Sequence, residues 1–235
     1  MPNQRNRGKN SNDDTLFGSE TIQQKLIEAI VDMHYLLTRG YAEKSSLQLV
    51  GNKHRLTVRQ QQAVRGMSAS QQQIERRQYH EISFDNLDTQ TIIIDGFNLL
   101  IILESALSGA YVFKGLDNCY RDLSGVHGTY KRVQQTENAL LLVGNLLKNH
   151  DVIWIFDKPV SNSGKLKTML REIAEEHHFN WEVILENNPD KVLAESEHIV
   201  VSSDAWVLDR ADRWLNLGAY IIEQHISEAT IIHSK

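Results

Sequence analysis

The chain has 235 residues, a formal net charge of −5 and a single cysteine, Cys119. One cysteine excludes an intramolecular disulfide framework and a cysteine-rich zinc site. No apolar run approaches the roughly 20 residues that a membrane span requires. The polar start of the chain also lacks the apolar core of a signal peptide, so the sequence predicts a cytoplasmic protein with no membrane partner.

The charges are unevenly distributed along the chain. Residues 1–82 carry 12 basic and 8 acidic side chains, whereas residues 83–235 carry 13 and 22. A basic part suits contact with nucleic acid, and concentrated carboxylates suit a divalent metal ion. Two ordinary solvated surfaces would give the same charges, and charge alone favours that alternative.

The N-terminal third of the chain reads as a tail followed by a small helical domain. Residues 1–20 have almost no apolar content and are predicted to be disordered. Residues 21–82 are predicted to form an all-α domain, with an amphipathic helix over 22–38 and short helices over 43–51 and 58–66. Several basic residues cluster around the third helix of this helix-turn-helix-like pattern: Lys53, His54, Arg55, Arg59 and Arg65. These residues suit contact with phosphates, or they form the solvated face of a packing domain.

Residues 83–235 alternate apolar strand-like runs with helical patterns, after a polar helix or linker at 68–80. This alternation predicts an α/β domain whose parallel sheet is covered on both faces. Residues 110–128 are predicted to be an irregular loop, and Pro189 and Asp190 to mark a turn. The predicted strands are 91–95, 151–156, 181–185, 198–202 and 219–222. The predicted helices are 98–109, 131–149, 165–177 and 205–216.

Three aspartates directly follow predicted strands: Asp95, Asp157 and Asp204. Aspartate is unfavourable in strands, and the carboxyl ends of parallel strands lie side by side at about 4.8 Å spacing. Carboxylates so close together repel one another unless a cation such as Mg²⁺ or Mn²⁺ is bound between them. Such an ion would orient a phosphate and activate a water molecule. Each aspartate taken alone also suits a turn or a helix N-cap.

Three segments carry a resemblance to a known family. Ile92-Ile93-Ile94-Asp95-Gly96-Phe97-Asn98 resembles the opening motif of NYN domains, a strand followed by Asp-Gly-x-Asn. Trp154-Ile155-Phe156-Asp157 resembles their second strand. Val200-Val201-Ser202-Ser203-Asp204, with Gly218-Ala219-Tyr220-Ile221-Ile222 downstream, resembles their Thr/Ser-x-Asp strand end and closing strand. Residues 91–222 therefore resemble the PIN/NYN superfamily of metal-dependent ribonucleases.

This resemblance implies a PIN-like three-layer domain with strand order 3-2-1-4-5, in which Asp95 and Asp204 come together. The whole chain is also similar to a prokaryotic family of unknown function that joins a helical N-terminal domain to such a domain. PIN domains usually add an acid in mid-domain, for which Glu137 is the first candidate and Glu104 the second. Asp209 is either a further metal ligand or the partner of Arg213 in an i,i+4 ion pair.

Several polar residues are candidates for substrate contact. A run of small polar residues enters a helix, which suits an anion site or a plain helix start. The stretch 121–132 offers hydrogen-bond donors and a histidine that is equally suited to the surface. The substrate candidates are Asn98, Arg121, His127, Ser161, Asn162, Ser163, Gly164, Lys165 and Ser203.

The leading hypothesis is a Mg²⁺- or Mn²⁺-dependent endoribonuclease. Asp95, Asp157 and Asp204 would be catalytic and would hold the metal, with Glu137 and Asp209 as additional ligands. RNA is the expected partner, presented by the helical domain, and a homo-oligomer is left open. One alternative is a catalytically inactive PIN-like module that binds nucleic acid or protein. Another is a phosphatase-like hydrolase of small molecules that uses the same carboxylates.

Overall fold

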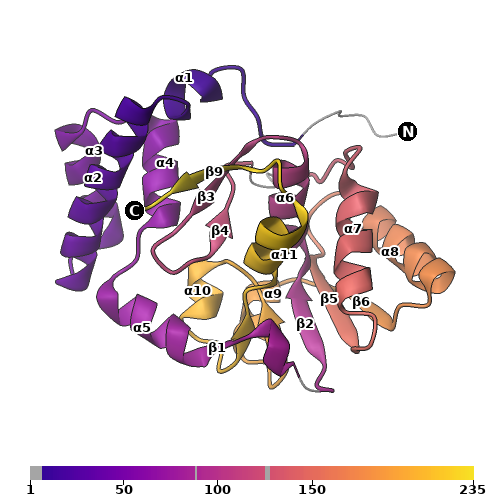
Figure 1. Ribbon diagram of the computed structural model, residues 1–235. Coiled ribbons are helices and arrows are strands. Elements are labelled where there is room, and N and C mark those ends of the chain that lie inside the picture. Colours follow the sequence, from indigo (N-terminus) through magenta and orange to yellow (C-terminus); the bar gives the residue numbers. More distant parts are fainter. Residues whose placement is uncertain (1–6, 88, 125–127) are drawn as a thin grey trace.

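A six-stranded, all-parallel sheet forms the centre of the molecule, in the order β1-β8-β7-β2-β5-β6 (Figure 1). The computed structural model describes residues 7–87, 89–124 and 128–235. The chain is thus an α/β protein with an N-terminal helical region, as the sequence predicts. The strands are β1 (Glu81–Ile82), β2 (Ile92–Asp95), β5 (Val152–Asp157), β6 (Trp181–Glu186), β7 (Ile199–Val201) and β8 (Trp214–Leu215).

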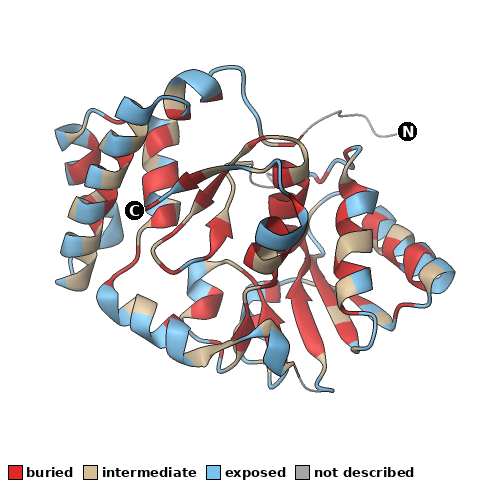
Figure 2. Ribbon diagram, viewed as in Figure 1, coloured by how far each residue is buried: buried red, intermediate tan, exposed pale blue. Residues whose placement is uncertain are grey.

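Both faces of the sheet are covered, which explains why its strands are continuous apolar runs. All four residues of β2 are buried. Ile92 and Ile94 pack into a large apolar cluster that also contains residues of α6 (Gly96–Leu107), α7 (Thr136–Leu146), α8 (Ser163–His177) and α11 (Leu217–His225). Ile93 packs into a second cluster, with residues of α9 (Pro189–Ala194) and α10 (Ala205–Leu208). Figure 2 shows the central strands buried and the outer helix faces exposed.

The helical region packs against a second, smaller sheet. It comprises α1 (Asp13–Phe17), α2 (Glu20–Thr38), α3 (Glu43–Lys53), α4 (Val58–Met67) and α5 (Gln71–His80), and η1 (Phe84–Asn86) follows β1. The second sheet, in the order β4-β3-β9, consists of β3 (Tyr111–Lys114), β4 (Tyr120–Arg121) and β9 (Thr230–His233). Phe113 and Ile232 of this sheet lie in the same apolar cluster as the helical region. None of the described helices is long and apolar enough to cross a lipid bilayer.

The N-terminal segment differs from its prediction. Residues 1–20 were expected to be disordered, yet residues 7–20 are structured and residues 13–17 form α1. Phe17 is fully buried in the helical core, and Arg7 forms an ion pair with the buried Glu104. The segment is therefore attached by the apolar side chain of Phe17 and by the buried ion pairs of Arg7 and Asp13, which its overall polar composition does not reveal.

Three further predicted elements are wrong. The expected irregular loop over 110–128 contains β3 and β4, which pair in an antiparallel ladder. The expected strand over 219–222 lies within the helix α11, and the expected helix over 205–216 ends at Leu208. Trp214–Leu215 takes the fifth place in the sheet, pairing with β7 on one side and β1 on the other. The first four predicted strands do have the implied order, since β6, β5, β2 and β7 are consecutive neighbours.

Candidate functional site

An acidic cleft of about 350 Å³ lies at the carboxyl ends of β2, β5 and β7. The structure brings together Asp95, Asp157 and Asp204 there, at the edge where parallel α/β sheets bind their ligands. Asp190 and Asp122 also line the cleft. The remaining lining residues are Phe97, Asn98, Ile101 and Val160.

Asp95 is the most buried of these acids, with an exposed fraction of 9 %. Its side chain caps α6, accepting a hydrogen bond from the Asn98 N–H (3.4 Å), and also accepts one from the Ser202 hydroxyl (2.8 Å). Burial raises the pKa of Asp95 to about 7, and the negative charges of Asp190 and Asp204 add to this effect. The hydrogen bonds are too few to compensate for the lost hydration of a carboxylate.

Gly96 allows α6 to begin directly against β5. A Cβ atom at this position would collide with the ring of Phe156, whose aromatic edge lies against the helix start. The glycine of the Asp-Gly-Phe-Asn segment thus sets how closely the capping residue Asp95 approaches the neighbouring strand.

Asn98 and the residues after β7 form a hydrogen-bonded turn beside Asp95. Asn98 Oδ1 accepts hydrogen bonds from the Ser203 N–H (2.7 Å) and hydroxyl (2.9 Å), while the Ser202 hydroxyl accepts one from the Asp204 N–H (3.0 Å). Asn98 and Ser203, expected to contact substrate, therefore join the start of α6 to this turn. Asn98 also lines the cleft.

Asp204 caps the short helix α10. Its Oδ1 atom accepts hydrogen bonds from the N–H groups of Trp206 (2.8 Å) and Val207 (3.1 Å). Its other carboxylate oxygen has no hydrogen-bond partner among the residues that the structure describes. Asp204 therefore both caps α10 and lines the cleft, because α10 begins at the cleft.

Asp190 and Asp122 are the acids of the cleft that the sequence reasoning missed. Asp190 lies in the first turn of α9, where Pro189 occupies one of the first two helical positions. Burial raises the pKa of Asp190, and the charges of Asp204 and Asp157 raise it further. Burial also raises the pKa of Asp157. The segment Asn188-Pro189-Asp190 is a typical helix start and was the available signal.

Two predicted metal ligands lie elsewhere. Glu137, on α7, is exposed and pairs with Arg132 (2.9 Å). Asp209 accepts hydrogen bonds from Gln73 (2.7 Å) and Arg77 (2.8 Å) of α5, instead of pairing with Arg213. Neither residue lines the cleft, so both are removed from the candidate ligands.

Glu104, the second candidate for a mid-domain acid, is fully buried. Its carboxylate accepts hydrogen bonds from Arg7 (2.7 Å), Tyr130 (2.5 Å) and Thr136 (2.5 Å). It therefore has a structural role in attaching the N-terminal segment, and it is not among the residues that line the cleft.

The predicted anion-binding run lies at the start of α8. Asn162, in the left-handed region with φ 71°, donates its side-chain N–H to the Tyr130 carbonyl (2.9 Å) and does not cap the helix. Ser163 is buried, whereas Ser161, Gly164 and Lys165 are exposed. Of this region only Val160 lines the cleft. The run is therefore next to the cleft but outside its lining.

Arg121 is held by protein groups. It donates hydrogen bonds to both carboxylate oxygens of Asp117 (2.9 and 2.7 Å) and to the Ser203 carbonyl (3.0 Å). Arg77 donates to the same carboxylate (2.5 Å). Arg121 was predicted to contact substrate. In the structure its guanidinium group instead supports the turn that leads to Asp204. His127 lies outside the described residues.

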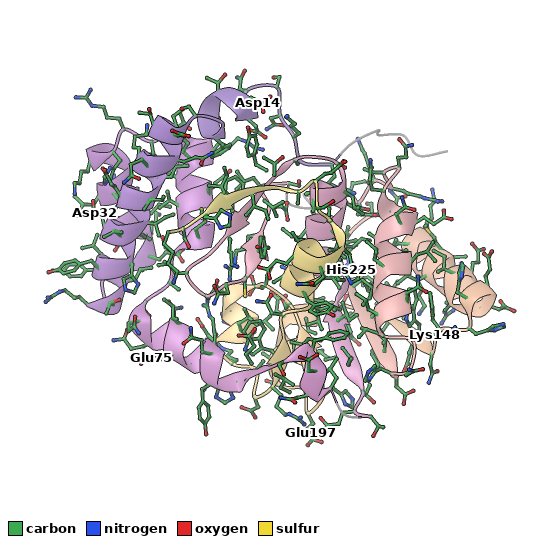
Figure 3. The ribbon with its side chains drawn as sticks, in the orientation of Figure 1. Asp14, Asp32, Glu75, Lys148, Glu197 and His225 are labelled. Carbon is green, nitrogen blue, oxygen red and sulfur yellow. The ribbon has the colours of Figure 1, made fainter. Side chains whose placement is uncertain are left out.

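Most of the basic residues around α4 are also engaged within the protein. Asp32, on the outer side of the helical region in Figure 3, pairs with Lys53 and His54. Arg59 pairs with the buried Asp13 (2.6 Å) and donates to the Gly8 carbonyl (3.1 Å). Exposed Arg65 pairs with exposed Glu43. The predicted basic face is thus largely neutralised.

The molecule is therefore an α/β protein with an acidic cleft at the carboxyl edge of its main sheet, joined to a helical region. The chain belongs to the family described as Domain of unknown function (DUF5616), which matches residues 84–220, more than half of the chain. Residues 25–79, within the helical region, match the family described as Protein of unknown function (DUF434).

A similar protein is an uncharacterized protein of the archaeon Methanocaldococcus jannaschii. It is 30 % identical over 179 residues, which cover 75 % of this chain and 86 % of the relative. The shared part therefore spans most of both proteins. No solved structure matches this chain.

Proposed function

We propose that this protein is a metal-dependent nuclease, related to PIN/NYN domains, that hydrolyses RNA phosphodiester bonds at the acidic cleft. The observation that carries the proposal is the meeting of Asp95, Asp157, Asp190 and Asp204 at one cleft. Their burial and mutual repulsion cost free energy, which the helix capping by two of them, Asp95 and Asp204, does not explain. The neighbouring order of β6, β5, β2 and β7 agrees with the order that the resemblance implies.

The donor set fits a hard divalent cation. Carboxylate oxygens are the preferred ligands of Mg²⁺ and Mn²⁺. Among the described residues, no three acidic, histidine or cysteine side chains form a ready-made metal site. Mg²⁺ usually keeps several water ligands and binds through one or two carboxylates and the substrate phosphate. Asp95 and Asp204 are the first candidates to hold it, with Asp157 and Asp190 beside them.

Such an ion, when bound, would polarise the phosphate and lower the pKa of a water molecule for in-line attack. The protein residues would position these groups. Ser202 fixes the Asp95 carboxylate, and Asn98 fixes the turn that carries Asp204. A carboxylate that is not holding the ion can accept the proton from water, and the raised pKa of Asp190 suits that role.

Cleavage of a mixed RNA pool tests the proposal. The assay compares Mn²⁺, Mg²⁺ and EDTA for the wild type, Asp95→Asn and Asp204→Asn, with the exposed Glu197→Gln as the control (Figure 3). We expect cleavage that needs the metal, is lost in both aspartate variants and persists in Glu197→Gln. RNA binding without cleavage would instead support an inactive binding module. Hydrolysis of small phosphate esters alone would support a phosphatase-like enzyme.

A further inference from the structure

A larger cavity, of about 530 Å³, lies between the helical region and the α/β part. Gln62 and Arg65 of α4 line it from the helical region, while Asn98, Asp122 and Asp204 line it from the α/β part. We call this cavity the junction groove. Its volume lies within the range of about 300–1,000 Å³ that is usual for ligand sites.

The junction groove is continuous with the acidic cleft. Asn98, Asp122 and Asp204 line both cavities. A chain-like ligand with one phosphate in the cleft would therefore extend into the groove, whereas a small phosphate ester would fill the cleft alone. The continuity thus favours a polymer as the ligand.

The groove offers one cation that a ligand can reach easily. Arg77 and Arg121 also line it, but both are bound to the buried Asp117. Arg65 is different, because its only ion-pair partner among the described residues is Glu43, and the two side chains are 61 % and 52 % exposed. Exposed ion pairs contribute little, so a phosphate oxygen can compete for the Arg65 guanidinium.

An exposed aromatic side chain directly follows a groove residue in the sequence. Trp206 follows Ala205, which lines the groove, and is 45 % exposed. The Arg210 guanidinium lies 4.1 Å from the centre of the indole ring and donates a hydrogen bond to the Trp206 carbonyl (2.9 Å). An exposed indole ring is a surface on which an unpaired nucleobase can stack.

We propose that the junction groove and Trp206 bind a single-stranded RNA segment that flanks the phosphodiester in the acidic cleft. The inference rests on the proposed function and adds the form of the substrate. Arg65 binds a backbone phosphate, Gln62 offers an amide to base edges, and Trp206 stacks on a base. A base inside a duplex is already stacked on both sides, so this combination selects a single strand.

Fluorescence anisotropy with a labelled, unstructured RNA of about 12 nucleotides tests this proposal. The full chain is titrated in EDTA, so that binding is measured without cleavage. The variants are Arg65→Ala and Trp206→Ala, and their matched controls are the exposed Arg171→Ala on α8 and Tyr79→Ala on α5. Thermal unfolding of each variant checks that the fold is retained.

We expect each groove variant to bind at least about fivefold more weakly than the wild type, and both controls to bind normally. Arg65→Ala should also lower the slope of log affinity against log salt concentration by about 1, because one phosphate contact is lost. Arg65→Lys should keep that slope. A duplex of the same sequence should bind more weakly than the single strand.

Wild-type affinity in both groove variants, or a preference for the duplex, would overturn the groove proposal. Cleavage assays on the same proteins separate this proposal from the nuclease. If Arg65→Ala and Trp206→Ala bind RNA normally and still cleave it with metal, the groove proposal is overturned and the nuclease proposal stands. Weakened binding in the groove variants of a protein that cleaves nothing supports the groove and overturns the nuclease.

Discussion

The Ser202 hydroxyl donates a 2.8 Å hydrogen bond to Asp95 Oδ2, joining the ends of two neighbouring strands that are far apart in the sequence. The same hydroxyl accepts a hydrogen bond from the Asp204 N–H (3.0 Å). One serine thus fixes the distance between the two acids that we propose as the main metal ligands. The pairing of β2 with β7 creates this relationship, since no local segment contains both groups.

The raised pKa of Asp95 predicts a stability that falls as pH rises. The folded protein holds its proton up to about pH 7, whereas the unfolded chain releases it near the usual value of 3.8. Between these values the folded state binds more protons, so the free energy of unfolding decreases with pH and then levels off above pH 7. Each pKa unit corresponds to about 1.4 kcal/mol, which sets an upper limit of about 4 kcal/mol.

Asp95→Asn should make this fall in stability with pH less steep and raise the stability at pH 8 in EDTA. Urea unfolding at pH 5 and pH 8 measures the effect. Asp85→Asn, at an exposed position, should leave the wild-type pH dependence in place. An Asp95→Asn protein whose stability falls between pH 5 and pH 7 as steeply as that of the wild type would contradict the assignment of that slope to Asp95.

Gly96→Ala should destabilise the protein by about 1–3 kcal/mol, the usual cost of overpacking a core. The added methyl group meets the Phe156 ring and forces α6 away from β5. Gly164→Ala is the matched control, because a Cβ atom there would meet nothing within 4 Å apart from its chain neighbours and the backbone of its own helix. Thermal and urea unfolding should show a loss for the first variant only. Adding Phe156→Leu should recover part of that loss, and no recovery would place the strain elsewhere.

The strand ends that form the cleft were predictable from the sequence, because an apolar run that is buried on both faces has a clear pattern. Ile92–Ile94 and Val152–Phe156 are such runs, and each is followed by an aspartate. Their order came from the resemblance, since burial patterns do not say which strands are neighbours. Asp190 was missed because its segment reads equally well as a turn or as a helix start.

The wrong elements have a common cause. Residues 219–222 form an apolar run too short for periodicity to distinguish a strand from a buried helix. Trp214–Leu215 is a strand of only two residues, which tertiary pairing alone creates. Glu137 and Asp209 resemble other acids in sequence, and their partners Arg132 and Arg77 become visible only in the fold. Local pattern thus identifies where acids follow strands, whereas long-range pairing decides which acids meet.

Arg7→Ala should destabilise the protein by about 3 kcal/mol or more, because it leaves the Glu104 charge buried without its cation. Lys9→Ala is the control on the same segment. Its pair with Asp14 is exposed, so its loss should have little effect on stability. Urea unfolding at neutral pH measures both. Equal effects of the two variants would show that Arg7 does not hold the N-terminal segment in place.

Asp117→Asn should weaken both the fold and the turn that carries Asp204. Burial alone would raise the pKa of Asp117, but the guanidinium groups of Arg121 and Arg77 outweigh it and hold the pKa at about 2. The carboxylate therefore stabilises the fold above about pH 4, and this stabilisation is lost as pH falls towards 2. Removing the charge leaves two buried guanidinium groups short of a partner, at a cost of about 3–5 kcal/mol.

Asp117→Asn should also loosen the turn at the cleft, because Arg121 donates a hydrogen bond to the Ser203 carbonyl (3.0 Å). Amide hydrogen exchange of Asp204 and Trp206 should accelerate in Asp117→Asn more than exchange in the distant helix α8. Glu137→Gln, which breaks an exposed pair, should change neither stability nor exchange at this turn. Uniform acceleration across the whole chain would instead mean that Asp117 supports global stability without specifically ordering the turn.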